Sequence, residues 1–239
     1  MRRGLVVTLL SAAVSTQACG GPIMIGPLRL DLGPRERVAS VTLTNEGAET
    51  LNYQAKVESW SQSATTPNTA PTDDIIVSPP ISALPPGKAQ IFRVALRHPL
   101  PPGAERSYRV ILTDVTPPPP PNAGPPQINF RIAQSLPLFV QTAPGGKPAL
   151  AVGACPPGDP GQLCVHIQND GDLHTLVRKV TFRSGDWTAG IAPNAVLLAG
   201  GGQPFKIVCP KTLPKDARIA VTVDAEGASA NGTIERPGL

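Results

Sequence analysis

Apolar and polar side chains alternate along most of the chain from Ile23 onwards, in short segments separated by turn residues. Alternate residues of a strand face the same side of a sheet, so a period of two predicts β-strands. The segments of this kind are IMIGPLRLDL, RVASVTLTN, LNYQAKVESW, AQIFRVALR, RSYRVILTDV and INFRIAQSLPLFV. Apolar residues nowhere recur over a long stretch at helical spacing, and prolines and glycines would soon interrupt an exposed helix. The pattern therefore predicts an all-β protein.

The alternation breaks at QTAPGGKP, residues 141–148, which contains two glycines and two prolines. A second series of strand-like segments follows, namely ALAVGA, LCVHIQNDG, TLVRKVTFRSG, AVLLAGG, QPFKIVC and ARIAVTVDAEG. Six or seven short strands on each side of a stiff linker predict two antiparallel β-sandwiches, over residues 22–143 and 148–239. The glycine-rich AGGGQPF, residues 199–205, lacks the Lys-Ser/Thr ending of a phosphate-binding loop and is predicted to form a hairpin.

The first eighteen residues, MRRGLVVTLLSAAVSTQA, have a basic start, an apolar run and small residues near their end. This arrangement is typical of a secretory signal peptide, so we expect export with cleavage after Ala18. A lipoprotein signal ending at Cys19 would need a small or apolar triplet before the cysteine, and Gln17 argues against it. Other apolar runs fall short of the roughly 20 residues that span a bilayer.

Composition excludes some classes of protein. The formal net charge is +4, and two of the positive charges, Arg2 and Arg3, belong to the predicted signal peptide. This bias is too weak to indicate binding to nucleic acid.

The four cysteines of an exported chain favour disulfides, and Cys155 and Cys164 flank a turn-rich loop, which makes them the most plausible local pair. The alternatives are reduced or otherwise paired thiols, and Cys209 in the apolar FKIVC is predicted to be buried.

Residues suited to catalysis or metal binding are sparse. His166 and His174 lie in or beside one predicted strand near Cys164, but their spacing matches neither HExxH nor a CxxC zinc site. The carboxylates of TDD, residues 72–74, are neighbours in sequence, so they point to opposite faces of an extended chain and form no acid/base pair. We therefore expect no enzyme, no metal and no cofactor.

Several sequence segments occur in a characteristic order. They are GPLRLDLGPRERVASVTLTNEGAETLNYQAKVESW, then PTDDIIVSPPISALPPGKAQIFRVAL at 71–96, ERSYRVILTDV at 105–115, and SLPLFV. Together they resemble the first domain of the periplasmic chaperones of pilus (fimbria) assembly by the chaperone-usher route, nearest to the archaic branch. CVHIQNDGDLHTLVRKV is similar to the opening hairpin of the second domain in that family. The resemblance covers essentially the whole mature chain and is looser after Val140.

This resemblance implies two immunoglobulin-like β-sandwich domains set at an angle, joined here by the short Pro/Gly linker. It also implies a location in the periplasm and two partners, a pilus or surface-fibre subunit and an outer-membrane usher. In the family, the subunit lacks its last strand and the chaperone lends one of its own, which is donor-strand complementation.

Residues 117–140, PPPPPNAGPPQINFRIAQSLPLFV, join a proline run to a patterned strand. Ile128, Phe130 and Ile132 point to one face of that strand, and the resemblance implies that they complete the core of the subunit. SLPLFV can then supply the packing of the first domain itself. Without the resemblance, the three residues would be expected to fill the core of this chain. An exposed apolar edge also predicts self-association of the free protein.

Members of the family anchor the C-terminal carboxylate of the subunit with an arginine on the first strand and a lysine at the end of the lending strand. Arg29 in PLRLDL matches the arginine, whose guanidinium can form two parallel bonds to a carboxylate. Pro137 stands where the lysine would be, so the anchor is incomplete or another base, such as Arg131 or Lys147, replaces it. The alternative for Arg29 is an ordinary solvated strand arginine.

A different class of function is a secreted two-domain module for adhesion or carbohydrate binding, or a piece of the fibre itself. Carbohydrate modules present aromatic platforms, whereas this chain has few aromatic residues, and Trp60 and Trp187 are far apart in sequence. A metal-dependent hydrolase that uses His166 and His174 is a third hypothesis, with weaker support.

Overall fold

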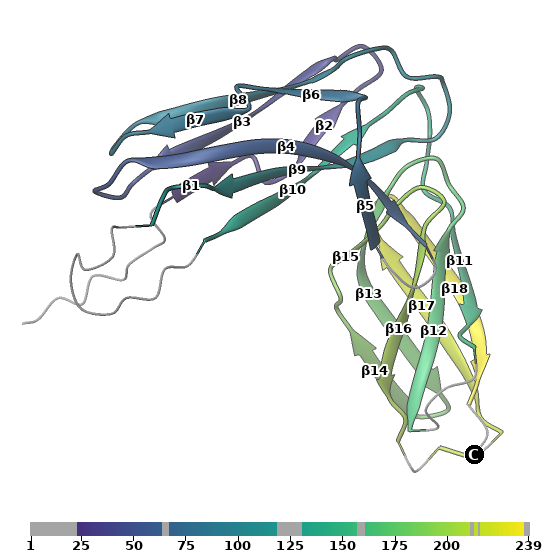
Figure 1. Ribbon diagram of the computed structural model, residues 1–239. Coiled ribbons are helices and arrows are strands. Elements are labelled where there is room, and N and C mark those ends of the chain that lie inside the picture. The colour runs from purple at the N-terminus through teal and green to yellow at the C-terminus, as the bar shows by residue number, and fades with distance from the viewer. Residues whose placement is uncertain are drawn as a thin grey trace, which may run out of the picture.

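The computed structural model describes residues 23–63, 67–118, 131–156, 161–210, 213–214 and 216–236. These residues form strands, turns and irregular segments but no helix, and the strands build two β-sandwiches that meet at an angle (Figure 1). In this described part, no helix is long and apolar enough to cross a membrane. The predicted all-β fold with two immunoglobulin-like domains is confirmed. The predicted signal peptide, residues 1–18, lies outside the described residues.

The first sandwich contains β1 (Ile23–Gly26), β2 (Leu30–Leu32), β3 (Val38–Asn45), β4 (Leu51–Gln62), β5 (Pro67–Pro71), β6 (Ile75–Ser78), β7 (Ile81–Leu84), β8 (Ala89–Leu96), β9 (Arg106–Asp114) and β10 (Ala133–Val140). One sheet has the order β1-β3-β8-β6, and the other has the order β2-β10-β9-β4-β5 with β7 also paired to β4. The chain changes sheet between β1, which is antiparallel to β3, and β2, which is parallel to β10. Each of these two short strands therefore forms the edge of one sheet, and the two edges lie on the same side of the sandwich.

The core of the first sandwich follows from the alternating pattern. On β10, Leu136, Leu138 and Val140 are buried in this core, so SLPLFV supplies the packing of its own domain as the sequence predicted. The other buried members of the cluster are Leu30, Leu32, Val41, Leu43, Tyr53, Ala55, Ile75, Leu84, Phe92, Val94, Tyr108, Val110 and Leu112. Phe139, on the opposite face of β10, is also buried but belongs to another cluster.

The TDD segment has a structural role. The hydroxyl group of Tyr108 donates a hydrogen bond to Oδ2 of Asp74 at 2.8 Å, and the backbone N–H of Asp74 donates to the Thr72 hydroxyl at 3.2 Å. Burial, together with the neighbouring Asp74, raises the pKa of Tyr108 well above its ordinary value. The segment is the bend that precedes β6.

The second sandwich contains β11 (Leu150–Ala154), β12 (Gln162–Asn169), β13 (Thr175–Ser184), β14 (Trp187–Ile191), β15 (Ala195–Leu197), β16 (Gly202–Val208), β17 (Arg218–Ala225) and β18 (Ala228–Glu235). One sheet has the order β11-β12-β16, and the other has the order β14-β13-β17-β18 with β15 paired to β13. Its separate core is built mainly from valine, leucine, isoleucine and phenylalanine. Each half of the chain thus buries its own core.

Two hairpins predicted from the sequence are wrong. AGGGQPF joins β15 to β16, but β15 pairs with β13 whereas β16 pairs with β12 in the other sheet. CVHIQNDGDLHTLVRKV likewise joins β12 to β13, which lie in different sheets. A period of two locates strands but carries no information about which strands pair.

Two buried asparagines explain why the chain turns from one sheet to the other after β3 and β12. Nδ2 of Asn169 donates to the backbone carbonyls of Leu173 and Leu198, at 2.8 and 3.1 Å. Asn45 holds the equivalent corner of the first sandwich, where its Nδ2 donates to the carbonyl of Leu84 at 2.8 Å. Both asparagines are fully buried, and each side-chain oxygen accepts a backbone N–H two residues later. These bonds direct the chain across the sandwich and not into a hairpin.

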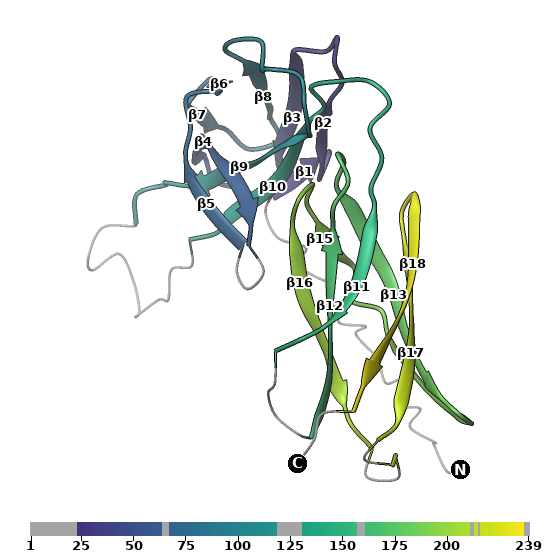
Figure 2. The same ribbon diagram turned by 90° about the vertical axis from the view of Figure 1, so that its right-hand side faces the viewer.

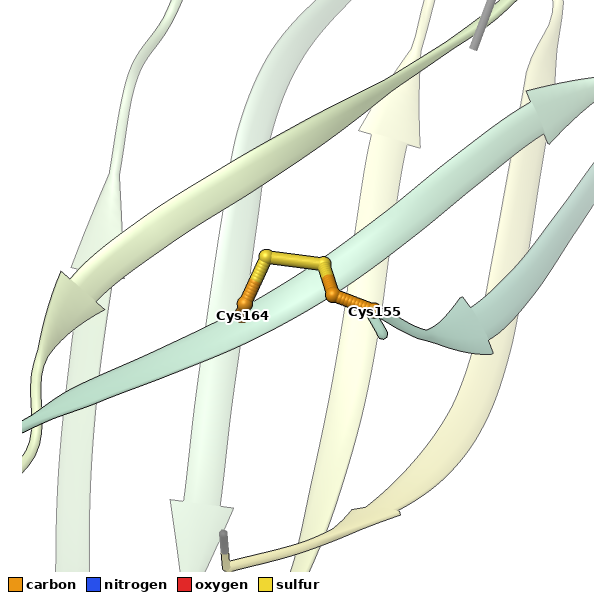
Figure 3. Close-up of a disulfide and its surroundings, with 2 residues drawn as sticks. All are labelled: Cys155 and Cys164. Atoms are coloured by element: carbon orange, nitrogen blue, oxygen red, sulfur yellow. A yellow bond between two sulfur atoms is a disulfide. The ribbon is translucent and has the colours of Figure 1, made fainter. Parts of the chain in front are cut away.

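The structure contains the disulfide between Cys155 and Cys164, the local pair favoured by the sequence (Figure 3). Their Cα atoms are 5.5 Å apart, within the usual range for a disulfide. Leu163 and Val165 of β12 are buried, so Cys164 lies on the outer face of its sheet. The bond ties the end of β11 to β12, while Cys209 is buried without a disulfide, as predicted.

Replacing both Cys155 and Cys164 by serine should lower the free energy of unfolding by about 2–4 kcal/mol, because the unfolded chain regains the freedom of the loop. Urea denaturation of the oxidised protein and of the double variant measures the difference. In Cys209→Ala, a reductant should still lower the midpoint as it does in the unaltered protein. Equal midpoints with and without reductant would show that the disulfide contributes no stability.

Candidate functional site

Strand β10 has one edge that is only partly covered. It pairs with β9 along its whole length, from Ala133 opposite Thr113 to Val140 opposite Arg106. Its pairing with β2 is limited to residues 138–140. Among the described strands, residues 133–137 therefore have a neighbour on one side only. Such an edge can accept an added strand through main-chain hydrogen bonds.

Ile132 lies immediately before this edge. Its backbone carbonyl accepts a hydrogen bond from the N–H of Asp114 at 3.1 Å, so the segment continues alongside β9. By the period of two, Ile132 shares a face with Leu136 and Leu138, yet it is 52% exposed whereas they are buried. Ile128 and Phe130 lie outside the described residues. The role of all three in binding a subunit stays a prediction.

Arg29 precedes β2, at the end of the open edge. Since Leu30 is the partner of Leu138 in the parallel register, Arg29 lies next to Pro137. Its Nε donates to Oδ2 of Asp31 at 2.8 Å, and its Nη1 lies 4.0 Å from Oε2 of Glu226 in the second domain. The side chain is about half exposed. The candidate anchor is thus near both domains and already contacts two carboxylates.

A second arginine lies on the same face of the sheet, one strand beyond Pro137. Arg109 of β9 is the direct partner of Pro137 in the antiparallel register, and its guanidinium carbon lies 3.6 Å from the ring centre of Trp60. Burial lowers the pKa of Arg109, because desolvation disfavours its charge. Glu58, opposite Arg109 on β4, pairs instead with Lys56 at 2.7 Å. Within the described residues, Arg109 has no acidic partner.

Arg131 and Lys147, the two bases that the sequence offered in place of the missing lysine, do not lie beside Pro137. Arg131 is exposed beside Ile132, and Pro137 lies six positions further along the extended chain, a span of roughly 20 Å. Lys147 is exposed in the linker, where its carbonyl accepts the N–H of Asp172 at 3.0 Å. Sequence reasoning missed Arg109, because in RSYRVILTD it resembles any outward-facing strand arginine. Only the strand register places it beside Pro137.

An aromatic and apolar cluster joins the two domains next to these arginines. Trp60 of β4, Phe139 of β10 and Leu198 of the second domain are buried together, with Val196 packed against them. The ring of Phe139 also stacks on His174, with centroids 3.5 Å apart. Figure 2 shows β4 and β5 beside the end of the second sandwich that carries β15 and β16.

Polar contacts reinforce this junction. Oε1 of the buried Glu105 lies 2.7 Å from Nδ1 of His174 and accepts the backbone N–H of the same residue at 3.2 Å. At the end of β4, the side-chain oxygen of Gln62 accepts the N–H of Leu198 at 3.0 Å, and its Nε2 donates to the carbonyl of Val196 at 3.2 Å. The first domain thus holds one end of the second through direct hydrogen bonds, although the other carboxylate oxygen of Glu105, Oε2, is buried without a hydrogen-bond partner in the described part of the chain.

The histidines considered for metal binding are separated by the fold. His166 faces outward on β12, 3.4 Å from Oε1 of Gln168, whereas His174 precedes β13 at the domain junction. In the described part of the chain, no group of three or more His, Cys, Asp or Glu side chains is placed to hold a metal ion. His174 instead contributes to the contact between the domains.

Comparison with known protein families assigns the chain to one of them. Residues 22–144 match the family described as pili and flagellar-assembly chaperone, PapD N-terminal domain. The match covers more than half of the chain, and the protein belongs to this family of chaperones. This family match does not favour the alternative of an adhesion or carbohydrate-binding module. No curated protein sequence matches the chain.

Solved structures share the fold. A chaperone–tip adhesion subunit complex, CsuC–CsuE from archaic chaperone-usher Csu pili of Acinetobacter baumannii, aligns with a TM-score of 0.60 and 21% identity, over 78% of this chain and 91% of that chain. The class 5 fimbriae chaperone CfaA aligns at 0.58 and 15%, over 91% and 100%. The SafA pilin complex with the SafB chaperone of Salmonella enterica aligns at 0.57 and 13%, over 89% and 95%. At these identities the similarity is evidence for the fold.

Phe139→Ala should loosen the domain junction without unfolding either sandwich, because Phe139 belongs to neither domain core. The expected loss of stability is about 3 kcal/mol, the lower end for removal of a buried phenylalanine. Small-angle X-ray scattering should report a larger radius of gyration. Ile91→Ala, on an exposed face of β8, is the control and should change neither quantity. An unchanged scattering curve for Phe139→Ala would contradict the role of the cluster.

Proposed function

We propose that this chain is a periplasmic chaperone that binds pilus or surface-fibre subunits by donor-strand complementation and delivers them to an outer-membrane usher. The observation that carries the proposal is the open edge of β10, residues 133–137, which continues into the exposed Ile132. Family membership supports the class of function. The similarity to the Csu complex supports the archaic branch. The proposal requires no catalytic residue, metal or cofactor.

Binding would combine main-chain pairing with insertion of apolar side chains. A strand of the subunit adds to the free edge of β10, and Ile128, Phe130 and Ile132 enter the incomplete core of the subunit. Burial of three such side chains contributes roughly 5–9 kcal/mol before ordering costs. Each main-chain hydrogen bond adds about 1 kcal/mol net. The lent strand, through its side chains and its main chain together, is therefore the main source of affinity.

The C-terminal carboxylate of the subunit would be held by Arg29 and Arg109. Both side chains project from the same face of one sheet, on strands separated only by β10. Neighbouring strands are about 4.8 Å apart, so the two backbones are roughly 10 Å apart, within reach of two long guanidinium side chains. Stacking on Trp60 orders Arg109. Because none of the acidic side chains that the structure describes pairs with it, its charge is available to a ligand. Arg109 thereby takes the place of the missing lysine.

Replacing Ile132 or Phe130 by aspartate should abolish capture of a subunit, because a charge would enter an apolar core. The variant chaperones should remain folded, since Ile132 is exposed. Co-expression in the periplasm with candidate subunits, followed by affinity purification of the chaperone, measures capture. Ile91→Asp, which changes an exposed isoleucine on the other sheet, is the matched control and should retain the subunit. Stoichiometric co-purification with Phe130→Asp would contradict donor-strand complementation.

Arg29→Ala should weaken binding of the captured subunit by about 1.5–3 kcal/mol, the contribution of a hydrogen bond to a charged group. Arg109→Gln should have a similar effect if it shares the carboxylate. Displacement by a competing chaperone with a distinguishable tag measures the dissociation rate. Arg93→Ala, an exposed arginine on β8, should leave that rate unchanged. A subunit held equally well by Arg29→Ala would exclude Arg29 as the anchor, and an unfolded variant would show a structural role.

A further inference from the structure

The tip of the β17–β18 hairpin places a carboxylate beside Arg29. Ala225 and Ala228 are the last pair of the hairpin, so Glu226 and Gly227 form its two-residue turn. The φ of Gly227 is +70°, a conformation that glycine adopts without strain. The turn brings Glu226 of the second domain to Arg29, which precedes β2 in the first.

Backbone and side-chain contacts set the position of Glu226, whose side chain stays partly exposed. Its backbone N–H donates to the carbonyl of Leu176 at 3.1 Å, and its own carbonyl accepts the hydroxyl of Thr175 at 2.7 Å. The side chain of Arg178 binds Oε1 of the carboxylate. The other oxygen, Oε2, is the one that lies 4.0 Å from Nη1 of Arg29. One carboxylate therefore bridges an arginine of each domain.

Within the described residues, Arg29 donates one hydrogen bond, from Nε to Asp31, and the 4.0 Å between its Nη1 and Oε2 of Glu226 is the distance of an ion pair and not of a hydrogen bond. Its Nε donates to Asp31 and its Nη1 faces Glu226, so both sides of the guanidinium fork carry an acidic neighbour. A guanidinium binds a carboxylate best through two parallel N–H bonds from one side of the fork. An incoming carboxylate that uses the Nη1 side of the fork must therefore take the place of Glu226 and also approach the negative charge of Asp31.

We propose that Glu226 is an internal occupant of the Arg29 carboxylate site, which holds this arginine in the free chaperone and yields it to the C-terminal carboxylate of a subunit. This inference rests on the proposed function, because it requires that Arg29 binds a carboxylate. Of the two acids, Glu226 is the one that leaves, since its contact with Arg29 is longer than that of Asp31 and Arg178 retains it afterwards. Displacement breaks this direct link between the second domain and Arg29.

The minimal probe is acetate, added to the mature protein at constant ionic strength. The Nε–H signal of Arg29 in an NMR spectrum, identified by its loss in Arg29→Lys, reports binding. Glu226→Gln should lower the dissociation constant of acetate at Arg29 by about two- to five-fold, the range that an exposed ion pair contributes. Asp224→Asn is the matched control, because it removes an exposed negative charge from the same hairpin without a contact to Arg29, and it should leave the constant unchanged.

The outcomes separate the inference from the proposed function. Equal dissociation constants for the unaltered protein and Glu226→Gln would overturn the internal occupant while leaving the carboxylate site. An equal gain in Glu226→Gln and Asp224→Asn would also overturn it, because a general change of charge would then explain the effect. The absence of a saturable shift at Arg29 in all of these proteins would exclude the carboxylate site and with it the internal occupant, whereas donor-strand complementation rests on the edge of β10 and is tested separately by capture of a subunit. Thermal unfolding of each variant verifies that the fold is retained.

Discussion

An unpaired strand edge is the constraint on which this structure depends. Residues 133–137 of β10 present main-chain donors and acceptors that neither β2 nor another described strand covers. Exposed edges of this kind promote association, and most proteins shield them. Pro137 has no N–H to donate, and the pairing with β2 begins only after it. The buried side chains of Leu136, Leu138 and Val140 anchor β10 in the core of its own domain. The free edge of the strand can therefore pair with a partner while β10 stays part of its own sheet.

The second domain is fixed against the first beside this strand edge. Trp60, Phe139 and Leu198 form an apolar contact between the sandwiches, and the buried Glu105 binds His174 beside it. The same region orders Arg109 through its stacking on Trp60. Domain packing and the electrostatics of the candidate carboxylate site are therefore linked. Glu226 extends this link, because the charge that occupies Arg29 comes from the other domain.

The candidate site could be predicted in part. The sequence singled out Arg29 and Ile132 because they belong to segments with a recognisable order. The structure places Arg29 just before β2 and Ile132 just before β10, two strands that pair, and the roles of both residues in binding a subunit stay predictions. Arg109 and Glu226 could not be found in this way. Each is an ordinary polar residue in an alternating strand or a turn, and its importance arises from strand register and domain contact. The NxG repeat after β3 and β12 was a usable signal for the sheet-crossing corners, because its asparagine is buried in both domains.

The sequence by itself determined most of the strands, their inward faces and the division into two domains, because these depend on local alternation and on the positions of proline and glycine. It also made the Cys155–Cys164 pair the most plausible disulfide, since the two cysteines flank a short loop. It did not separate β1 from β2, which the single segment IMIGPLRLDL joins and which lie in different sheets. Only the tertiary structure decided which strands pair, and so corrected both predicted hairpins. It also decided where these charges lie, because strand pairing places Arg109 opposite Pro137, one strand from the position next to Arg29, and domain packing brings Glu226 to Arg29.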